Sequence, residues 1–337
     1  MNKYGPSTLS SFVLLLFFFH NHLIKDVITL FQMKEFPEFS WSHSRHKLLM
    51  ECPRKYGYTY YISHNGWLFD APLLAQQAYR LKKLTTLPMF FGQAVHNVIE
   101  KTIKRYMKHH YIPTVSELEA TVRSDLRKAF IDSRDHGDLW YHKPNHYIMF
   151  FEFYKHGYLT KTETKEINDR LGTCLHHFLQ SKTFKELTSH PAINIIESKK
   201  FRSTYVDHIK MYAVLDLLYQ DDGKYVIVDW KTGKHSTDDL TQLAVYALYV
   251  MKKYEIPLEK IEIRNEYLLT GSCHTYQLNS QDIQSLLNLM ATSIDMMTTY
   301  LKQPDENNPL PLHSFPENGN PFQCNQCFYK ELCESIE

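Results

Sequence analysis

The chain has little of several features that mark common classes of protein. It has only 11 glycines in 337 residues, and neither a Gly-x-Gly-x-x-Gly pattern nor a phosphate-loop pattern occurs, which argues against a glycine-rich nucleotide loop. Six cysteines are too few for a secreted disulfide scaffold, and their clustering indicates a reducing, cytoplasmic location. The net charge of +1 gives no whole-chain argument for a nucleic-acid partner, so any DNA-binding surface must be local.

The N-terminal segment is apolar but short. Residues 12–19, with Leu9 just before them, form an apolar run of about ten residues, whereas a helix that crosses a membrane needs about twenty. Lys3 is the only basic residue before the run, and no small-x-small cleavage site follows it. We therefore expect residues 1–35 to be a hydrophobic leader, either a peripheral helix or an extension upstream of a start at Met33. No membrane partner is expected.

Four of the six cysteines form one pattern. Cys52 stands alone, and Cys324, Cys327 and Cys333 lie close together near the other end of the chain. Two thiolates separated by two residues can bind one centre from a single turn, and four soft ligands suit zinc or an iron–sulfur cluster. The third nearby cysteine favours such a centre over a redox Cys-x-x-Cys pair. The spacing does not separate zinc from iron–sulfur, and either would tie residue 52 to the C-terminus.

The first half of the chain is expected to be helical. Residues 40–62 and 92–109 have apolar side chains at three- and four-residue steps, with Pro88 ending the segment before the second helix. Residues 115–190 are also expected to be mostly helical. Their aromatic residues are expected to be core rather than a platform for nucleic-acid bases, namely Tyr141, Tyr147, Phe150, Phe151, Phe153 and Tyr154.

After Pro191 the pattern changes, and together the two halves predict an α/β protein. Runs rich in Ile, Val and Tyr predict three consecutive antiparallel strands over 194–205, 210–219 and 224–230, the last two joined by a turn at 221–223. The remaining prediction is a helix over 237–254, a strand over 261–270, a helix over 280–301 and a loop over 304–321.

A second chemical pattern lies at the end of the third predicted strand. Asp229 and Lys231 point to the same face of a strand, and Trp230 points to the opposite face. A carboxylate beside an ammonium suits metal-assisted phosphodiester hydrolysis, because the carboxylate holds a divalent cation and the lysine positions or deprotonates water and counters charge. An acid two residues before a lysine is common by chance, but this one ends an apolar strand and precedes a turn at Gly233.

Further residues support this hypothesis to different degrees. Asp216 lies in an apolar run, where an unpaired carboxylate would be costly, so it either forms a salt bridge or shares a cation with Asp229 across the hairpin. Gln242 and Tyr246 are four residues apart and lie on one helix face. His96, taken alone, fits a satisfied core histidine better than a metal ligand.

Taken together, these residues resemble the RecB-like branch of the PD-(D/E)XK nuclease superfamily. Within it, the chain is similar to members with a four-cysteine iron–sulfur cluster, such as AddB-type nuclease domains and CRISPR-associated RecB-like exonucleases. The resemblance covers residues 38–337, although Ala213 replaces a glycine that is usual before the motif-two aspartate. It depends on the order of Cys52-Pro53-Arg54, Gly92-Gln-Ala-Val-His96, Leu215-Asp216, Val228-Asp229-Trp230-Lys231-Thr232-Gly233, Gln242-x-x-x-Tyr246 and the three C-terminal cysteines.

The resemblance implies a fold and roles for the matching positions. The fold would be a restriction-endonuclease-like core, a small mixed central sheet flanked by helices, in a single domain over 36–337. A helical insertion at about 111–190 and a cysteine-stapled C-terminus would complete it. The implied roles are Mg²⁺ or Mn²⁺ binding by His96, Asp216, Asp229 and the Trp230 carbonyl, catalysis by Lys231, DNA contact by Gln242 and Tyr246, and a structural 4Fe–4S cluster on Cys52, Cys324, Cys327 and Cys333.

The expected function is hydrolysis of DNA by a metal-dependent exonuclease acting on single-stranded ends. No helicase motif occurs, so any helicase would be a separate chain. The alternative is a non-catalytic DNA-binding or scaffold subunit of a helicase–nuclease or defence complex, against which the intact set of charged residues argues. A basic channel is expected among Arg80, Lys82, Lys83, Lys101, Lys104, Arg105 and Lys108.

Overall fold

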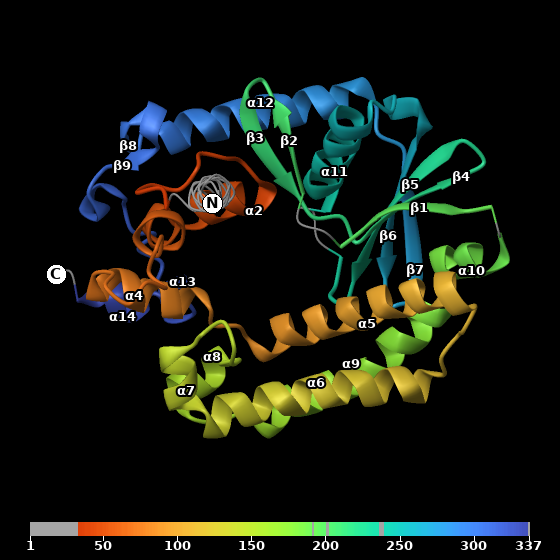
Figure 1. Cartoon of the computed structure of the whole chain (residues 1–337), viewed down its shortest axis with the longest axis horizontal. Helices are drawn as coiled ribbons and strands as arrows, with labels where there is room; N and C mark the ends of the chain where they lie inside the picture. Colours follow the sequence, from red (N-terminus) through yellow and green to blue (C-terminus); the bar gives the residue numbers. More distant parts are fainter. Residues whose placement is uncertain (1–32, 191, 200–201, 236–238, 336–337) are drawn as a thin grey trace, which may run out of the picture.

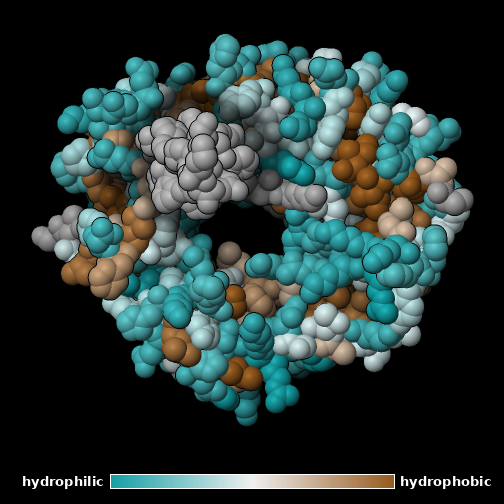
Figure 2. Space-filling view, viewed as in Figure 1, coloured by the Kyte–Doolittle hydropathy of each residue, from teal (hydrophilic) through white to brown (hydrophobic). Residues whose placement is uncertain are grey.

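The computed structural model describes residues 33–190, 192–199, 202–235 and 239–335. The hydrophobic leader expected over residues 1–35 lies almost entirely outside these described residues. Within them, no helix is both long enough and apolar enough to cross a membrane. The elements are arranged as a ring around a central opening (Figures 1 and 2).

A five-stranded mixed sheet forms the right side of the ring in Figure 1. The strand order is β1-β4-β5-β6-β7, with β5 antiparallel to β4 and parallel to β6. A central strand covered on both faces needs apolar residues on both, which explains the nearly continuous apolar run at 226–230. The strands are β1 (Asn194–Ser198), β4 (Leu217–Asp221), β5 (Lys224–Lys231), β6 (Ile261–Tyr267) and β7 (Ser272–Tyr276). The small mixed sheet flanked by helices is confirmed.

The prediction of three consecutive strands is wrong, because two of them break. Pieces of the first two runs leave the sheet as a separate hairpin of β2 (Arg202–Val206) and β3 (Ile209–Ala213). The Lys199 N–H donates to the carbonyl oxygens of Leu215 (3.0 Å) and Asp216 (3.2 Å), which closes the base of this inserted hairpin. The residues on both sides of each break favour strands, so strand propensity does not reveal where the strands break. The strand predicted over 261–270 ends at Tyr267, and β7 was not predicted.

The two faces of the sheet contact two separate hydrophobic cores. Val226, Val228 and Trp230 of β5 pack with α5 (Leu87–His109), α6 (Val115–Asp135), α9 (Lys161–Gln180) and α10 (Lys182–Ser189). Ile227 faces the other way and packs with α11 (Asp239–Tyr254) and α12 (Ser280–Thr298). This alternation places Asp229 and Lys231 on the face toward α11, as their spacing predicts. The helix α12 ends three residues before the predicted boundary at 301.

The helix expected over 40–62 is broken at Cys52. Pro53 restricts the residue before it to extended backbone, and Cys52 has φ −164° and ψ 110° between α2 (His43–Glu51) and α3 (Pro53–Gly57). A π-helical turn, Tyr58–Ile62, follows directly. The second predicted helix begins at Leu87 rather than Gly92, because Pro88 occupies the first turn, where a missing N–H is tolerated.

Residues 115–190 are mostly helical, as expected, with the shorter helices α7 (Gly137–His142) and α8 (Phe151–His156) between α6 and α9. Phe150 is fully buried there, but the side chains of Tyr141 and Tyr154 are 51% and 38% exposed, so the prediction of a core position is wrong for these two. Before α5 lies α4 (Leu73–Lys82). The stretch 304–321 is mostly irregular, as expected, between β8 (Leu301–Gln303), β9 (Asn308–Pro309), α13 (Pro321–Asn325) and α14 (Lys330–Glu334).

The helical part below the sheet is expected to be integral to the fold. Leu171→Ala in α9 removes a fully buried side chain from the core of α5, α6 and α9. It should lower the free energy of unfolding by about 2–5 kcal/mol, measured by denaturant unfolding followed by circular dichroism. The matched change Leu73→Ala removes a side chain that is 81% exposed on α4 and should cost less than about 0.5 kcal/mol. Similar losses in both variants would contradict this packing.

Candidate active site

Two carboxylates lie side by side where β4 begins and β5 ends. Leu217 pairs with Val228 in the antiparallel register, so Asp216, one residue earlier, lies opposite Asp229. Asp229 is 4% exposed, and the side chain of Asp216 is 12% exposed. Neighbouring buried carboxylates repel each other unless cations or hydrogen-bond donors compensate their charge.

Asp216 is compensated by the long helix α5 and by the neighbouring strand. His96 Nδ1 lies 2.8 Å from Asp216 Oδ1, and the backbone N–H of Trp230 donates to Asp216 Oδ2 at 3.0 Å. Gly92 allows α5 to approach, because a Cβ there would lie 3.3 Å from Thr232 Oγ1. His96, which is four residues further along the same helix face, thereby reaches the carboxylate.

Asp229 is compensated by Lys231 and by a closed set of polar contacts with α11. Lys231 Nζ lies 2.8 Å from Asp229 Oδ2 and donates to Gln242 Oε1 at 2.6 Å. Gln242 Nε2 donates to the Tyr246 hydroxyl at 2.6 Å, and that hydroxyl donates to Asp229 Oδ1 at 3.3 Å. The four-residue spacing of Gln242 and Tyr246 therefore brings two polar groups of one helix face onto the Asp229–Lys231 pair.

The electrostatics of the two carboxylates differ. Burial, and after it the charge of Asp216, raises the pKa of Asp229 to about 6. Burial opposes ionisation of Asp216 too, but the charge and hydrogen bond of His96 outweigh it and lower the pKa of Asp216. Burial likewise opposes the charge on Lys231, yet Asp229 raises the pKa of the Lys231 amine. The lysine is therefore a protonated donor in this site.

Sequence reasoning missed three residues of this site. Asp239 Oδ1 lies 3.7 Å from Lys231 Nζ, and Asp239 Oδ2 accepts a hydrogen bond from the Tyr267 hydroxyl at 2.6 Å. Its position three residues before Gln242, one helical turn away, could have indicated it. Arg170 Nη2 of α9 donates to the Thr232 carbonyl at 2.5 Å, so the helical part at 111–190 supports the turn after Lys231. Lys199 adds positive charge near Asp216.

The donor set suits a hard divalent cation, which prefers carboxylate oxygens. Asp229 Oδ2 is buried and has no hydrogen bond of acceptable geometry, although it is within ion-pair distance of Lys231. Within the described ranges, no group of three or more His, Cys, Asp or Glu side chains is arranged to hold one metal ion. At this site His96 and Lys231 each engage one carboxylate, and a bound cation would have to take over both contacts.

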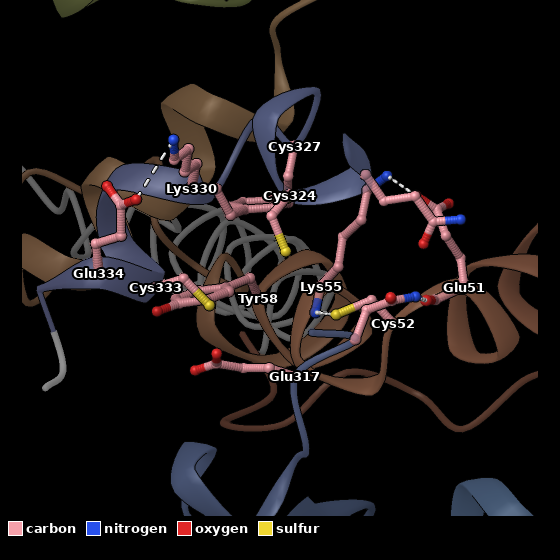
Figure 3. Close-up of a pocket in the computed structure, with 13 residues that line it drawn as sticks. Glu51, Cys52, Lys55, Tyr58, Glu317, Cys324, Cys327, Lys330, Cys333 and Glu334 are labelled. Atoms are coloured by element: carbon pink, nitrogen blue, oxygen red, sulfur yellow. Dashed lines mark hydrogen bonds and ion pairs between the residues drawn. The ribbon is translucent and has the colours of Figure 1, made fainter. Parts of the chain in front are cut away.

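The four cysteines line one pocket on the opposite side of the ring from the sheet (Figures 1 and 3). All four are free thiols, and burial raises the pKa of Cys333 to about 11. Figure 3 shows the Cys52 and Cys333 sulfur atoms facing the space that Cys324 and Cys327 also line. The predicted linkage of the C-terminus through the four cysteines is not shown. Contacts that need no metal hold this region together.

Those contacts join the segment after Cys52 to the C-terminal segment. Arg54 Nε donates to the Phe315 carbonyl at 2.6 Å, and Arg54 Nη1 pairs with Glu317 Oε1 at 3.1 Å. Tyr58 stacks on Tyr329 with ring centroids 5.2 Å apart. Side-chain contacts therefore already join residues 54–58 to the C-terminal segment around the cysteine pocket.

Comparison with known proteins identifies the family of the chain but not its site residues. The family model of the PD-(D/E)XK nuclease superfamily matches residues 40–334. No curated protein was found to match the chain. Among solved structures, the crystal structure of SSO0001 is 14% identical, with 72% of this chain and 97% of that chain covered, but its TM-score of 0.26 supports no further argument. On the family match, the chain belongs to the PD-(D/E)XK nuclease superfamily.

Proposed function

We propose that the protein is a metal-dependent deoxyribonuclease of the RecB-like branch that hydrolyses phosphodiester bonds at single-stranded DNA ends. The observation that carries the proposal is the meeting of Asp216, Asp229 and Lys231 in one buried site of a PD-(D/E)XK chain. A non-catalytic DNA-binding or scaffold subunit would have no need to keep two buried carboxylates side by side, because they disfavour each other's charge. A reducing cytoplasm suits the free cysteines, and any helicase partner would be a separate chain.

His96, Asp216, Asp229 and the Trp230 carbonyl would hold Mg²⁺ or Mn²⁺. Such a cation polarises a phosphoryl oxygen and lowers the pKa of bound water. Lys231, protonated between two carboxylates, donates hydrogen bonds and offsets negative charge that develops on the phosphate. Gln242 and Tyr246 restrict the orientation of that amine and of Asp229, and they face the substrate strand from α11.

The four cysteines are proposed to hold a structural 4Fe–4S cluster, with zinc as the alternative. The cysteine pocket has a volume of about 180 Å³, many times the roughly 10–15 Å³ that one water molecule requires. The support for either centre is that all four thiols line this one pocket. The cluster would strengthen the closure that Arg54 and Tyr58 already make between the two chain ends.

Cleavage is expected to depend on the paired charges. Asp229→Asn and Lys231→Ala should each lower the rate by about 100-fold or more, because one removes a metal ligand and the other a charge that stabilises the transition state. The measurement is cleavage of end-labelled single- and double-stranded DNA with Mg²⁺ or Mn²⁺. Lys224→Ala, at the exposed beginning of the same strand, is the control and should cut normally. Undiminished cleavage by either site variant would refute the catalytic assignment.

Asp229→Asn should also stabilise the metal-free protein. The raised pKa of Asp229 means that its ionised form destabilises the fold above pH 6 and that this cost is relieved as pH falls toward the unfolded value of 3.8. At pH 8 in EDTA, the variant should gain about 1–3 kcal/mol in free energy of unfolding. Asp305→Asn, an exposed change, should have almost no effect. A lower stability of Asp229→Asn would show that the carboxylate is not under electrostatic strain.

Protein purified without oxygen is expected to be brown and to absorb at about 400 nm, as iron–sulfur centres do. Cys333→Ser should lose the colour and the iron, because it removes a ligand. Cys273→Ser changes a half-buried cysteine outside the pocket and should keep both. A colourless wild-type protein containing one equivalent of zinc would assign the site to zinc instead.

A further inference from the structure

Three pockets follow one another away from the active site. The first, of about 500 Å³, is lined by Gln242 and Tyr246 at one end and by Arg45 and Tyr60 at the other. The second, of about 570 Å³, shares Arg45 and Tyr60 and extends to Trp67. The third, of about 700 Å³, shares Trp67 and continues to α7. Neighbouring pockets share lining residues and are therefore adjacent, and we call the surface that the three form together the cationic groove.

The cationic groove carries charge of one sign. Among the described residues, no Asp or Glu lines any of the three pockets, in a chain with 38 basic and 37 acidic residues. Desolvation, and after it the charges of Lys83 and Arg45, lowers the pKa of the Lys82 amine to about 8. An anion in the groove would relieve this crowding of positive charge. The lysines and arginines of the lining are Arg45, Arg80, Lys82, Lys83 and Lys143.

This distribution divides the set of cations expected to form a channel. Arg80, Lys82 and Lys83 line the groove, whereas Lys101, Lys104, Arg105 and Lys108 of α5 line none of its three pockets. Ring contacts do not separate the two sets, because Arg105 lies over the Tyr111 ring and Arg80 lies over the Tyr141 ring at 4.0 Å from its centroid. The balanced charge of the whole chain therefore hides a local positive surface on α2, α4 and α7.

Exposed aromatic rings accompany the cations. Trp67 and Tyr141 are 52% and 51% exposed. Trp67 is held between His64 and Tyr79, with ring centroids 6.0 Å and 5.7 Å away. Gly66 makes this possible, since a Cβ there would lie 2.2 Å from the Ala75 carbonyl oxygen, so the turn packs directly on α4. A large ring that is fixed in place and left half in water is ready to stack on a flat ligand at little entropic cost.

We propose that the cationic groove grips single-stranded nucleic acid several nucleotides away from the bond that is cut. Arg80 already covers one face of the Tyr141 ring, 4.0 Å from its centroid. Bases therefore stack on Trp67 and on the opposite face of Tyr141, and Arg80 and Lys83 neutralise phosphates beside them. A single strand fits better than a duplex, because paired bases have no free faces for the exposed rings. That the bound strand continues to a bond that is cut rests on the proposed nuclease function. Binding of the strand by the groove does not. Strands too short to extend from Asp229 to Trp67 should be bound and cut poorly.

Binding without cleavage tests the groove by itself. Fluorescence anisotropy of labelled oligo(dT) in EDTA should show about fivefold weaker binding or more for Trp67→Ala and Tyr141→Ala, with Trp67→Phe close to wild type. Tyr205→Ala, at a ring 60% exposed outside the groove, is the control and should bind normally. Unfolding midpoints should agree among these variants, because the rings removed are half-exposed or more.

Charge and length provide two further readouts that a purely structural role would not change. Lys83→Ala should reduce the slope of log K against log salt concentration by about 0.7, and Lys101→Ala should leave it unchanged. The advantage of oligo(dT) of about 24 nucleotides over one of about 6 should disappear in Trp67→Ala.

The possible failures are distinguishable. If the groove variants weaken binding but the wild-type protein does not cleave DNA in Mg²⁺, the nuclease proposal is wrong and the groove proposal stands. If the wild-type protein cleaves DNA but Trp67→Ala and Tyr141→Ala bind oligo(dT) with unchanged affinity and unchanged length preference, the groove proposal is wrong. Equal affinity for duplex and single strand, or no binding of oligo(dT), would also overturn it.

Discussion

Burial of two neighbouring carboxylates is the constraint around which the rest of the structure is arranged. Asp216 and Asp229 lie opposite each other at the edge of a β-hairpin, where each disfavours the charge of the other. Separate elements bring compensating groups: His96 comes from α5, and Lys231 comes from β5 itself. In the proposed function, the site costs stability until a divalent ion compensates the two charges. This is the usual relation between a functional site and the fold that holds it.

The helical part between residues 111 and 190 helps to position the site. Its helices bury one face of β5, and Arg170 holds the turn that follows Lys231. On the other face, α11 supplies Gln242 and Tyr246. The strand is therefore clamped between two independent cores, and the positions of Asp229 and Lys231 are set by both. Precise placement of this kind is what transition-state stabilisation requires.

The ring joins three regions that are far apart in the sequence. Arg54 and Tyr58 bind the C-terminal segment beside the cysteine pocket, and the segment from α2 to α4 carries the cationic groove. The groove reaches Gln242 and Tyr246 at its other end. The segment that contacts the cysteine region therefore also carries the surface proposed to hold the strand, so a metal centre at the cysteines, if bound as proposed, would support substrate binding as well as stability.

Much of the site was visible in the residues alone. The spacing of Asp229 and Lys231 determines that they share a face, and the four-residue step from Gln242 to Tyr246 determines the same on a helix, because these are properties of local geometry. The helical first half also follows from periodicity, whereas the mixed sheet was implied only by the family resemblance, since the residue pattern predicted three antiparallel strands in a row. The break at Cys52, the hairpin inserted before Asp216 and the start of α5 at Leu87 did not follow, although proline chemistry at Pro53 and Pro88 explains two of them afterwards.

Only the tertiary structure decided the contacts between residues that are far apart in the sequence. How separate cores pack decides that Asp239 lies beside Lys231, that Arg170 contacts Thr232, and that Trp67 and Tyr246 line adjacent pockets. The sequence by itself determined which chemical groups each element presents and on which face. Packing decided which of those groups meet, because long-range contacts depend on the relative placement of whole elements and leave no periodic trace in the chain.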